Sequence, residues 1–208
     1  MVEIREAFFL TSVMKVEPVA LTGLRAELVP LERSHIPALY EAGQHDDIWY
    51  YMPLQTTPTL ERMTGSVESA LADQAAGTCL PFTILDRETD SVVGSTRLFD
   101  IFIAHRRGEI GHTWLTPSVW RTRINTECKY LLLKYAFETL DMIRVQLKTD
   151  LRNTRSQAAI ERLGAVKEGV LRNHFILPDG YIRHSVMYSI TDTEWPAAKT
   201  RLEDFLNQ

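Results

Sequence analysis

The chain has 208 residues, 45% of them hydrophobic and 24% charged, which is ordinary for a globular protein and sufficient for one domain with an ample core. The formal net charge of −4 and the pI near 5.9 count against a nucleic-acid-binding protein, which normally carries a basic excess. No uncharged run approaches the roughly 18 apolar residues of a membrane span, and Glu3 and Glu6 make the N-terminus atypical of a signal peptide, so we expect a cytoplasmic protein.

Periodicity, capping residues and turn residues predict an N-terminal extension (residues 1–20) and one domain (residues 21–208). The extension could be an intersubunit contact, a frayed tail or an added edge strand. Residues 46–58 are expected to form a loop or a short helical turn. The predicted strands are residues 24–30, 80–85, 92–103, 108–115, 143–149, 165–177 and 181–190, and the predicted helices are 34–40 (capped by Ser34), 59–77 (capped by Thr59), 125–140, 153–163 and 194–206.

This order, with antiparallel meander strands before the central helix, predicts a single mixed α/β domain. The two cysteines, Cys79 and Cys128, are far apart in the sequence and have no metal-ligand spacing. Both lie in apolar contexts, so we expect buried free thiols in a reducing compartment and no metal site.

The stretch from Gly108 to Glu127 reads as a buried strand, a short loop and the start of a helix. The first turn of a helix has unpaired N–H groups and partial positive charge, so such a junction binds anions. The loop also carries Arg121 and Arg123. The stretch therefore suggests a site for a phosphate-bearing cofactor, although an ordinary β–α connection with solvated arginines would look the same.

A second strand-to-helix junction follows at Asn153-Thr154-Arg155-Ser156. Asn153 is the natural N-cap and Ser156 falls at the third helical position. Capping alone would explain Asn153. Two successive junctions could nevertheless open on the same edge of the sheet, where one cofactor would meet both sets of free N–H donors.

Four segments of the chain match a known family pattern: W-x-x-x-x-N-T-E (Trp120, Asn125, Thr126, Glu127), KYLLLKYAFE (129–138), IRVQLKTDLRNTRSQAAIERLGAVKEGVLR (143–172) and DGYIRHSVMYSI (179–190). With these segments, the chain over residues 24–190 resembles the Gcn5-related N-acetyltransferases (GNAT family), in the branch of the ribosomal-protein N-terminal acetyltransferases. The resemblance implies a mostly antiparallel, twisted sheet, flanked by helices and splayed near the cofactor.

The resemblance implies acetyl-CoA as the donor and a primary amine as the acceptor, either a protein N-terminus or a small molecule, with direct attack in a ternary complex. It implies monomers or homodimers and no metal. Carried over to this sequence, the pyrophosphate site is Arg121, Thr122, Arg123, Ile124, Asn125 and Thr126; the pantetheine strand is Thr113, Trp114 and Leu115; Asn153 contacts the cofactor; and Ser156 protonates the leaving thiolate.

The chain departs from the family pattern in the phosphate loop. The consensus places glycine where Arg123 stands, and glycine or alanine where Asn125 stands. Glycine permits positive φ and close approach to phosphate. Arg123 offers neither, although its guanidinium could pair with a phosphate, while Asn125 tolerates left-handed φ and can cap.

The general base is expected on the strand at 108–115, where Glu109 and His112 alternate to opposite faces unless a bulge intervenes. Glu109 is the preferred base, and packing in the core is the simpler interpretation of His112. His174 and His184 could line the acceptor pocket. The aromatic cluster Trp49-Tyr50-Tyr51-Met52 could form its wall or simply pack over the core, and the neighbouring Asp46 and Asp47 would favour a cationic amine.

Two alternatives remain at this point. The same fold could use another acyl-CoA, because no residue fixes the acyl group. Alternatively, Arg123 has disabled the phosphate loop, and the domain serves as a CoA-binding or sensing module.

Overall fold

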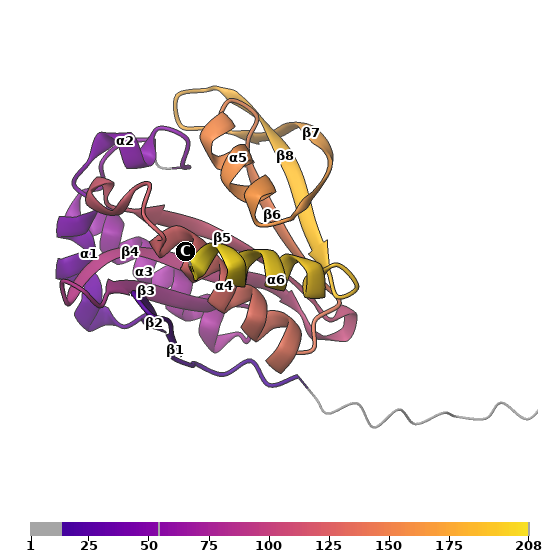
Figure 1. Ribbon diagram of the computed structural model, residues 1–208. Helices are drawn as coiled ribbons and strands as arrows, with labels where there is room; N and C mark the ends of the chain where they lie inside the picture. The colour runs from indigo at the N-terminus through magenta and orange to yellow at the C-terminus, as the bar shows by residue number, and fades with distance from the viewer. Residues whose placement is uncertain (1–13, 54, 208) are drawn as a thin grey trace, which may run out of the picture.

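The computed structural model describes residues 14–53 and 55–207. Their backbone forms one eight-stranded sheet in the order β1-β2-β3-β4-β5-β6-β8-β7 (Figure 1), in which every neighbouring pair is antiparallel except the parallel pair β5–β6. The strands are β1 (Leu21–Thr22), β2 (Ala26–Pro30), β3 (Leu80–Asp86), β4 (Ser91–Phe102), β5 (Arg107–Leu115), β6 (Arg144–Asp150), β7 (Val166–Ile176) and β8 (Ile182–Thr191).

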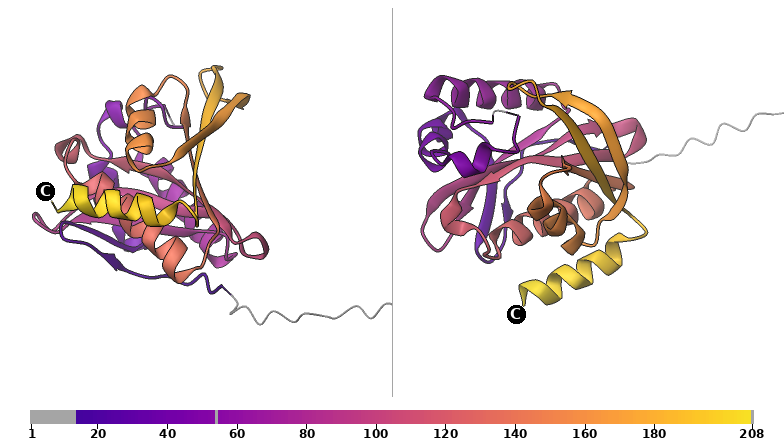
Figure 2. Two further views of the ribbon diagram at one scale, coloured as in Figure 1. Left: turned by 45° about the vertical axis from the view of Figure 1, so that its right-hand side comes forward. Right: turned by 90° about the horizontal axis from the view of Figure 1, so that it is seen from above.

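Helices cover both faces of this sheet, and α6 lies beside α4 (Figures 1 and 2). A main core joins the sheet to α4, α5 and α6, and a smaller core lies beneath α1, α2 and α3. The β7–β8 hairpin extends past the body of the sheet (Figure 2). The helices are α1 (Ile36–Ala42), α2 (Asp46–Trp49), α3 (Leu60–Ala75), α4 (Ile124–Lys134, continued by a π-helical turn at Tyr135–Thr139), α5 (Thr154–Arg162) and α6 (Trp195–Leu206).

The predicted mixed α/β class with a mostly antiparallel sheet is confirmed, and most predicted elements are present. Thr59 caps α3 as expected, with its side chain accepting a hydrogen bond from the Arg62 N–H. Ser34 does not cap α1, because a 3-10 turn at Arg33–His35 precedes that helix and the Ser34 hydroxyl donates to Glu32 instead. Both cysteines are free and buried, and burial raises the pKa of each thiol to about 12.

Part of the predicted N-terminal extension lies outside the described residues, which begin at Met14. The described part packs on its own domain, since Met14, Val16 and Val19 are partly buried against the main core. β1 then adds a short strand at the sheet edge. Within the part of the chain that the structure describes, no helix is long and apolar enough to cross a membrane.

Candidate functional site

The strands β5 and β6 are paired only as far as Glu109 and Gln146, after which they diverge. β5 continues to Leu115 and β6 to Asp150 without further pairing between them. The edge of β5 that faces β6 therefore leaves backbone groups outside the sheet, where an extended ligand could pair with them. We call residues 110–115 and 147–150 the wedge. The predicted splay of the sheet is present here.

A β-bulge lies within the wedge. The β4–β5 register slips by one residue, so His112 and Thr113 stand opposite the single residue Thr96, and His112 has a φ of 49°. The bulge turns His112 onto the face that carries Glu109: the imidazole lies edge-on to Phe99, the register partner of Glu109, with ring centroids 4.9 Å apart. Strict alternation would have separated the two candidate bases, and the bulge brings them to one face.

His112 is not packed in the core, contrary to expectation, because its ring lines a cavity of about 300 Å³ and keeps contact with solvent there. Desolvation by the surrounding protein, with the positive charges of Arg97 and Lys148, lowers the pKa of His112 to about 4. The imidazole is therefore neutral at pH 7. The cavity is lined by Leu31, Leu39, Trp49, Met52, Pro53, Arg62, Met63, Ser66, Val67, Ser69, Ser95, Arg97, His112 and Trp114.

Glu109 is 1% exposed and lies on the same face as His112. Its Oε1 is 2.8 Å from the Lys148 Nζ, and its Oε2 accepts a hydrogen bond of 2.8 Å from the Gln146 amide. The carboxylate is thus held in place by charge and by hydrogen bonding. Its role as the base stays a prediction.

The loop after β5 is fixed by hydrogen bonds to its own backbone. The Trp120 indole donates to the Leu115 carbonyl at 2.8 Å, and the Thr122 hydroxyl donates to the Val119 carbonyl at 2.7 Å. The Leu115 carbonyl therefore already accepts one hydrogen bond, and the Thr113 hydroxyl contacts Thr96 and Lys129. Trp114 packs into the smaller core, with its ring centroid 5.3 Å from that of Trp49.

Arg123 is free of the strain that the missing glycine would suggest. It has right-handed φ and ψ of −70° and −16°, and Asn125 lies within α4, so neither position requires the positive φ that glycine permits. The residue with positive φ is Arg121, at 61°. The sequence comparison therefore assigned the conformational demand to the wrong position, because loop φ angles depend on the whole connection.

The N-terminus of α4 keeps free donors. The first i→i−4 hydrogen bond runs from the Glu127 N–H to the Arg123 carbonyl, so the N–H groups of Asn125 and Thr126 precede the helical ladder. The Ile124 N–H is taken by the Thr122 hydroxyl at 3.3 Å. Ile124 and Thr126 are buried, so an anion here would meet backbone N–H groups and the two loop arginines.

The second junction lies against the first. Asn153 caps α5, with its side-chain oxygen accepting a hydrogen bond of 3.0 Å from the Ser156 N–H. The Arg155 guanidinium of α5 stacks on the Trp120 ring, with its carbon 4.2 Å from the ring centroid. Both strand-to-helix junctions therefore open on one edge of the sheet, as predicted.

A second cavity, of about 520 Å³, adjoins this stacked pair. Tyr50 and Tyr51 of the aromatic cluster line this cavity, whereas Trp49 packs inward and donates its indole N–H to the Gly43 carbonyl. That the cluster forms a wall of the acceptor pocket stays a prediction. The preference for a cationic amine stays a prediction, because the lining carries both acids and a base. The lining residues are Asp46, Asp47, Tyr50, Tyr51, Gln55, Thr56, Trp120 and Arg155.

The two histidines of the closing strands, His174 and His184, lie in different surroundings. The His184 Nδ1 accepts a hydrogen bond of 2.9 Å from the Asn173 N–H and supports the irregular part of β7. His174 lies beside Phe175, with ring centroids 4.0 Å apart, and the Lys148 Nζ and the Arg183 guanidinium carbon are 5.9 Å and 5.6 Å from the same Phe175 centroid. Desolvation, with the positive charges of Lys148 and Arg183, lowers the pKa of His174. Only His174 is therefore placed beside the polar face of the site.

Sequence reasoning missed two buried polar residues of α4. Lys129 donates to the Thr113 hydroxyl, which is 2.7 Å from the Thr96 hydroxyl, so the helix is tied to the bulge. Glu127 accepts hydrogen bonds from three successive backbone N–H groups at residues 24–26. A lysine within the apolar face of a helix was the available signal for Lys129. Glu127 belongs to the W-x-x-x-x-N-T-E match, which assigned it no role.

Comparison with known proteins gives a consistent result. The model of the acetyltransferase (GNAT) domain family matches residues 25–166. The N-acetyltransferase YoaA of Bacillus subtilis, itself uncharacterised, is 24% identical over 153 residues, which are 74% of this chain and 85% of that protein.

Solved structures of acetyltransferases are similar to this chain in fold. One from T. thermophilus, assigned to the acetyltransferases, is 38% identical, covers 93% of this chain and 100% of that chain, and has a TM-score of 0.82. RimJ of Mycobacterium smegmatis, solved in complex with CoA-disulfide, shares the fold at 22% identity and a TM-score of 0.80, over 91% of this chain and 95% of that chain.

Proposed function

Because this chain belongs to the GNAT acetyltransferase family, we propose that it transfers an acetyl group from acetyl-CoA to a primary amine, by direct attack in a ternary complex. The acceptor is a protein N-terminus or a small-molecule amine. The observation that carries the proposal is the wedge, whose unpaired strand edge leads to two helix N-termini.

The donor would lie along this edge. GNAT acetyltransferases use acetyl-CoA, and M. smegmatis RimJ, which has the same fold, was solved with CoA-disulfide. In our proposal the backbone of residues 113–115 pairs with the pantetheine arm, although the Leu115 carbonyl already accepts one hydrogen bond. The pyrophosphate meets residues 121–126, where helix N–H groups and guanidinium groups supply positive charge, and Asn153 contacts the cofactor from α5.

The proposed reaction needs one base and one acid. The neutral amine attacks the thioester carbonyl carbon, a C–N bond forms, and the C–S bond breaks as the tetrahedral intermediate collapses. Glu109, directly or through water, takes the proton that the amine loses. Ser156 gives its hydroxyl proton to the leaving thiolate of CoA, and exchange with water then returns a proton to Ser156 and removes the proton from Glu109. Free backbone N–H groups along β5 would stabilise the oxyanion.

The sensing-module alternative is less favoured, because Arg123 has right-handed φ and ψ and one of the two reasons for a disabled loop, the need for positive φ at that position, does not apply. The other alternative, a donor with a longer acyl group, is tested by comparing turnover with acetyl-CoA and with a longer acyl-CoA in the assay below.

Calorimetric titration with acetyl-CoA, followed by thiol release over a panel of peptides, polyamines and other amines, tests the proposal. We expect saturable cofactor binding and acceptor-dependent thiol release. Absence of binding at millimolar acetyl-CoA would refute it. Faster turnover with a longer acyl-CoA would keep the reaction class and change the donor.

A further inference from the structure

Arg183 on β8 is a buried cation without a carboxylate partner. The residue is 7% exposed, and among residues 14–53 and 55–207 no carboxylate lies within ion-pair distance and no acceptor reaches its Nε. By contrast, Arg25, Arg144 and Arg152 each hold a carboxylate with two nitrogens. The guanidinium carbon lies 5.6 Å from the centroid of the Phe175 ring, and the buried Nε–H donor is left without an acceptor, which is unfavourable. A ligand with an acceptor group would satisfy this donor.

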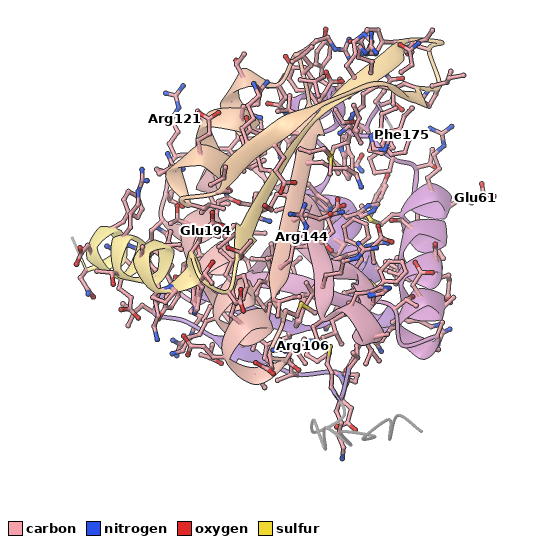
Figure 3. All side chains as sticks on the ribbon, turned by 90° about the vertical axis from the view of Figure 1, so that its right-hand side faces the viewer. Glu61, Arg106, Arg121, Arg144, Phe175 and Glu194 are labelled. Atoms are coloured by element: carbon pink, nitrogen blue, oxygen red, sulfur yellow. The ribbon has the colours of Figure 1, made fainter. Side chains whose placement is uncertain are left out.

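Strand register places Arg183 on the face of β8 that points away from the main core. Ser185, two residues further along β8, pairs with Asp150 of β6, and Arg183 pairs with Phe175 of β7. The alternate residues of β8 enter the main core on the opposite face. Figure 3 shows Phe175 on the side of the hairpin where α3 lies, away from Arg121 of the phosphate loop. Arg183 thus faces away from the proposed phosphate site.

Among the described residues, two further buried polar atoms, on β7 and β8, have no hydrogen-bond partner. They are the Ser185 Oγ, on the same face of the same strand, and the His174 Nδ1 on β7. His174 and Arg183 both contact Phe175: the His174 and Phe175 ring centroids are 4.0 Å apart, and the Arg183 guanidinium carbon is 5.6 Å from the Phe175 centroid. Within the described part of the chain, one nitrogen of the guanidinium, the Ser185 hydroxyl oxygen and one nitrogen of the imidazole are therefore buried without hydrogen-bond partners.

The nearby acids do not neutralise Arg183. Glu109 and Asp150 both act on its charge, but each is already engaged: Glu109 with Lys148 at 2.8 Å, and Asp150 with Arg152 at 2.9 Å. These two pairs leave the positive charge of Arg183 in excess. An anionic group is the ligand chemistry that this excess favours, and the planar fork of a guanidinium matches a carboxylate.

We propose that Arg183, together with Ser185 and His174, binds a carboxylate that the acceptor amine carries near its amino group. The inference rests on the proposed acetyl transfer and specifies its substrate class. The carboxylate could belong to a free amino acid or to an acidic N-terminal residue of a peptide. Either acceptor would place its amine toward the wedge while its acid group lies on Arg183.

Matched acid and amide pairs test this proposal. Amino acids are compared with their α-carboxamides, and peptides beginning with Asp or Glu with those beginning with Asn or Gln, by thiol release with acetyl-CoA. We expect the wild type to favour the acid by at least tenfold in kcat/KM in one of the two sets, which also identifies the source of the carboxylate. Equal rates within every pair would overturn the proposal.

Variants of Arg183 test whether this residue causes the preference for the acid over the amide. Arg183→Gln should lower kcat/KM for the acid at least tenfold more than for the amide, through KM, and Arg183→Lys should retain part of the preference. Arg172→Gln, on the exposed part of β7, is the matched control and should leave the acid preference unchanged. An equal loss of kcat/KM for acid and amide in Arg183→Gln would show that the residue has only a structural role. If this variant fails to fold, Arg183→Lys and the acid and amide pairs on the wild type still test the carboxylate proposal.

Calorimetry of the acids on the CoA-loaded protein separates the two proposals. If no amine is acetylated but the acid binds the wild type at least tenfold more tightly than Arg183→Gln, acetyl transfer fails and the carboxylate site stands. If amines are acetylated and the acid binds both proteins equally, the reaction stands and the site fails.

Discussion

Replacement of Lys129 by methionine should make the protein more stable at acidic and neutral pH. The ammonium lies between α4 and the sheet, 7% exposed, and its partner is the neutral hydroxyl of Thr113 rather than a carboxylate. Burial lowers the pKa of Lys129 from 10.5 to about 8. Methionine keeps the length of the side chain and removes the charge, and Thr113 keeps its contact with Thr96.

The pKa shift sets the size and sign of this effect. Because the folded pKa lies below the unfolded one, the unfolded chain binds more protons between pH 8 and 10.5, and stability rises with pH through this window. Below pH 8 the charged lysine costs roughly 3 kcal/mol, at about 1.36 kcal/mol per pKa unit. Between pH 6 and pH 9 about 1.4 kcal/mol of that cost should disappear.

Urea denaturation of the wild type and Lys129→Met at pH 6, 7, 8 and 9 measures this difference. The variant should be the more stable protein at pH 6, and its advantage should shrink by about 1.4 kcal/mol by pH 9. Lys134→Met, at an exposed position of the same helix, is the control and should show no such trend. A difference between wild type and Lys129→Met that does not change with pH would refute the reasoning.

Three further predictions concern the proposed catalytic groups and the cap. Ser156→Ala should slow turnover by about 10²-fold or more, in the range of general acid catalysis, while acetyl-CoA affinity measured by calorimetry stays nearly unchanged; a large loss of binding would make Ser156 a cofactor contact. Glu109→Gln should lower kcat by a similar factor and remove the acidic limb of the pH–rate profile, whereas an unchanged limb would exclude Glu109 as the base. Asn153→Ala should reduce the free energy of unfolding by about 1 kcal/mol in urea titrations, as loss of an N-cap does, and no change would mean that the cap bond to Ser156 contributes nothing.

The regular elements were predictable because their signals are local. The apolar periodicity of α4, the cap at Thr59 and the cap at Asn153 each depend on residues a few positions apart. Ser34 shows the limit of this reasoning, because whether a hydroxyl caps a helix depends on where the preceding 3-10 turn ends. The end of α4 shows it too, since its π-helical turn has no simple sequence signal.

The candidate site was predictable in its composition and only partly in its geometry. The two strand-to-helix junctions and the glutamate of β5 can be read from the chain, since each is a short motif. The sequence did not predict that Glu109 and His112 share a face, because a one-residue bulge reverses the alternation of side chains beyond it. The positive φ at Arg121 rather than Arg123 is equally hidden, because a loop satisfies its end constraints as a whole.

The sequence by itself determined the family resemblance, the order of strands and helices, and the residues of the proposed donor half of the site, because these depend on neighbouring residues. Only the tertiary structure decided which partners the charged side chains meet: among the described residues, Lys148 meets Glu109, Lys129 meets Thr113, and Arg183 meets no carboxylate. Burial and pairing depend on residues that are distant in the chain and come together only when the sheet forms. The proposed acceptor half of the site is built from such contacts, so its chemistry could not be derived from the sequence alone.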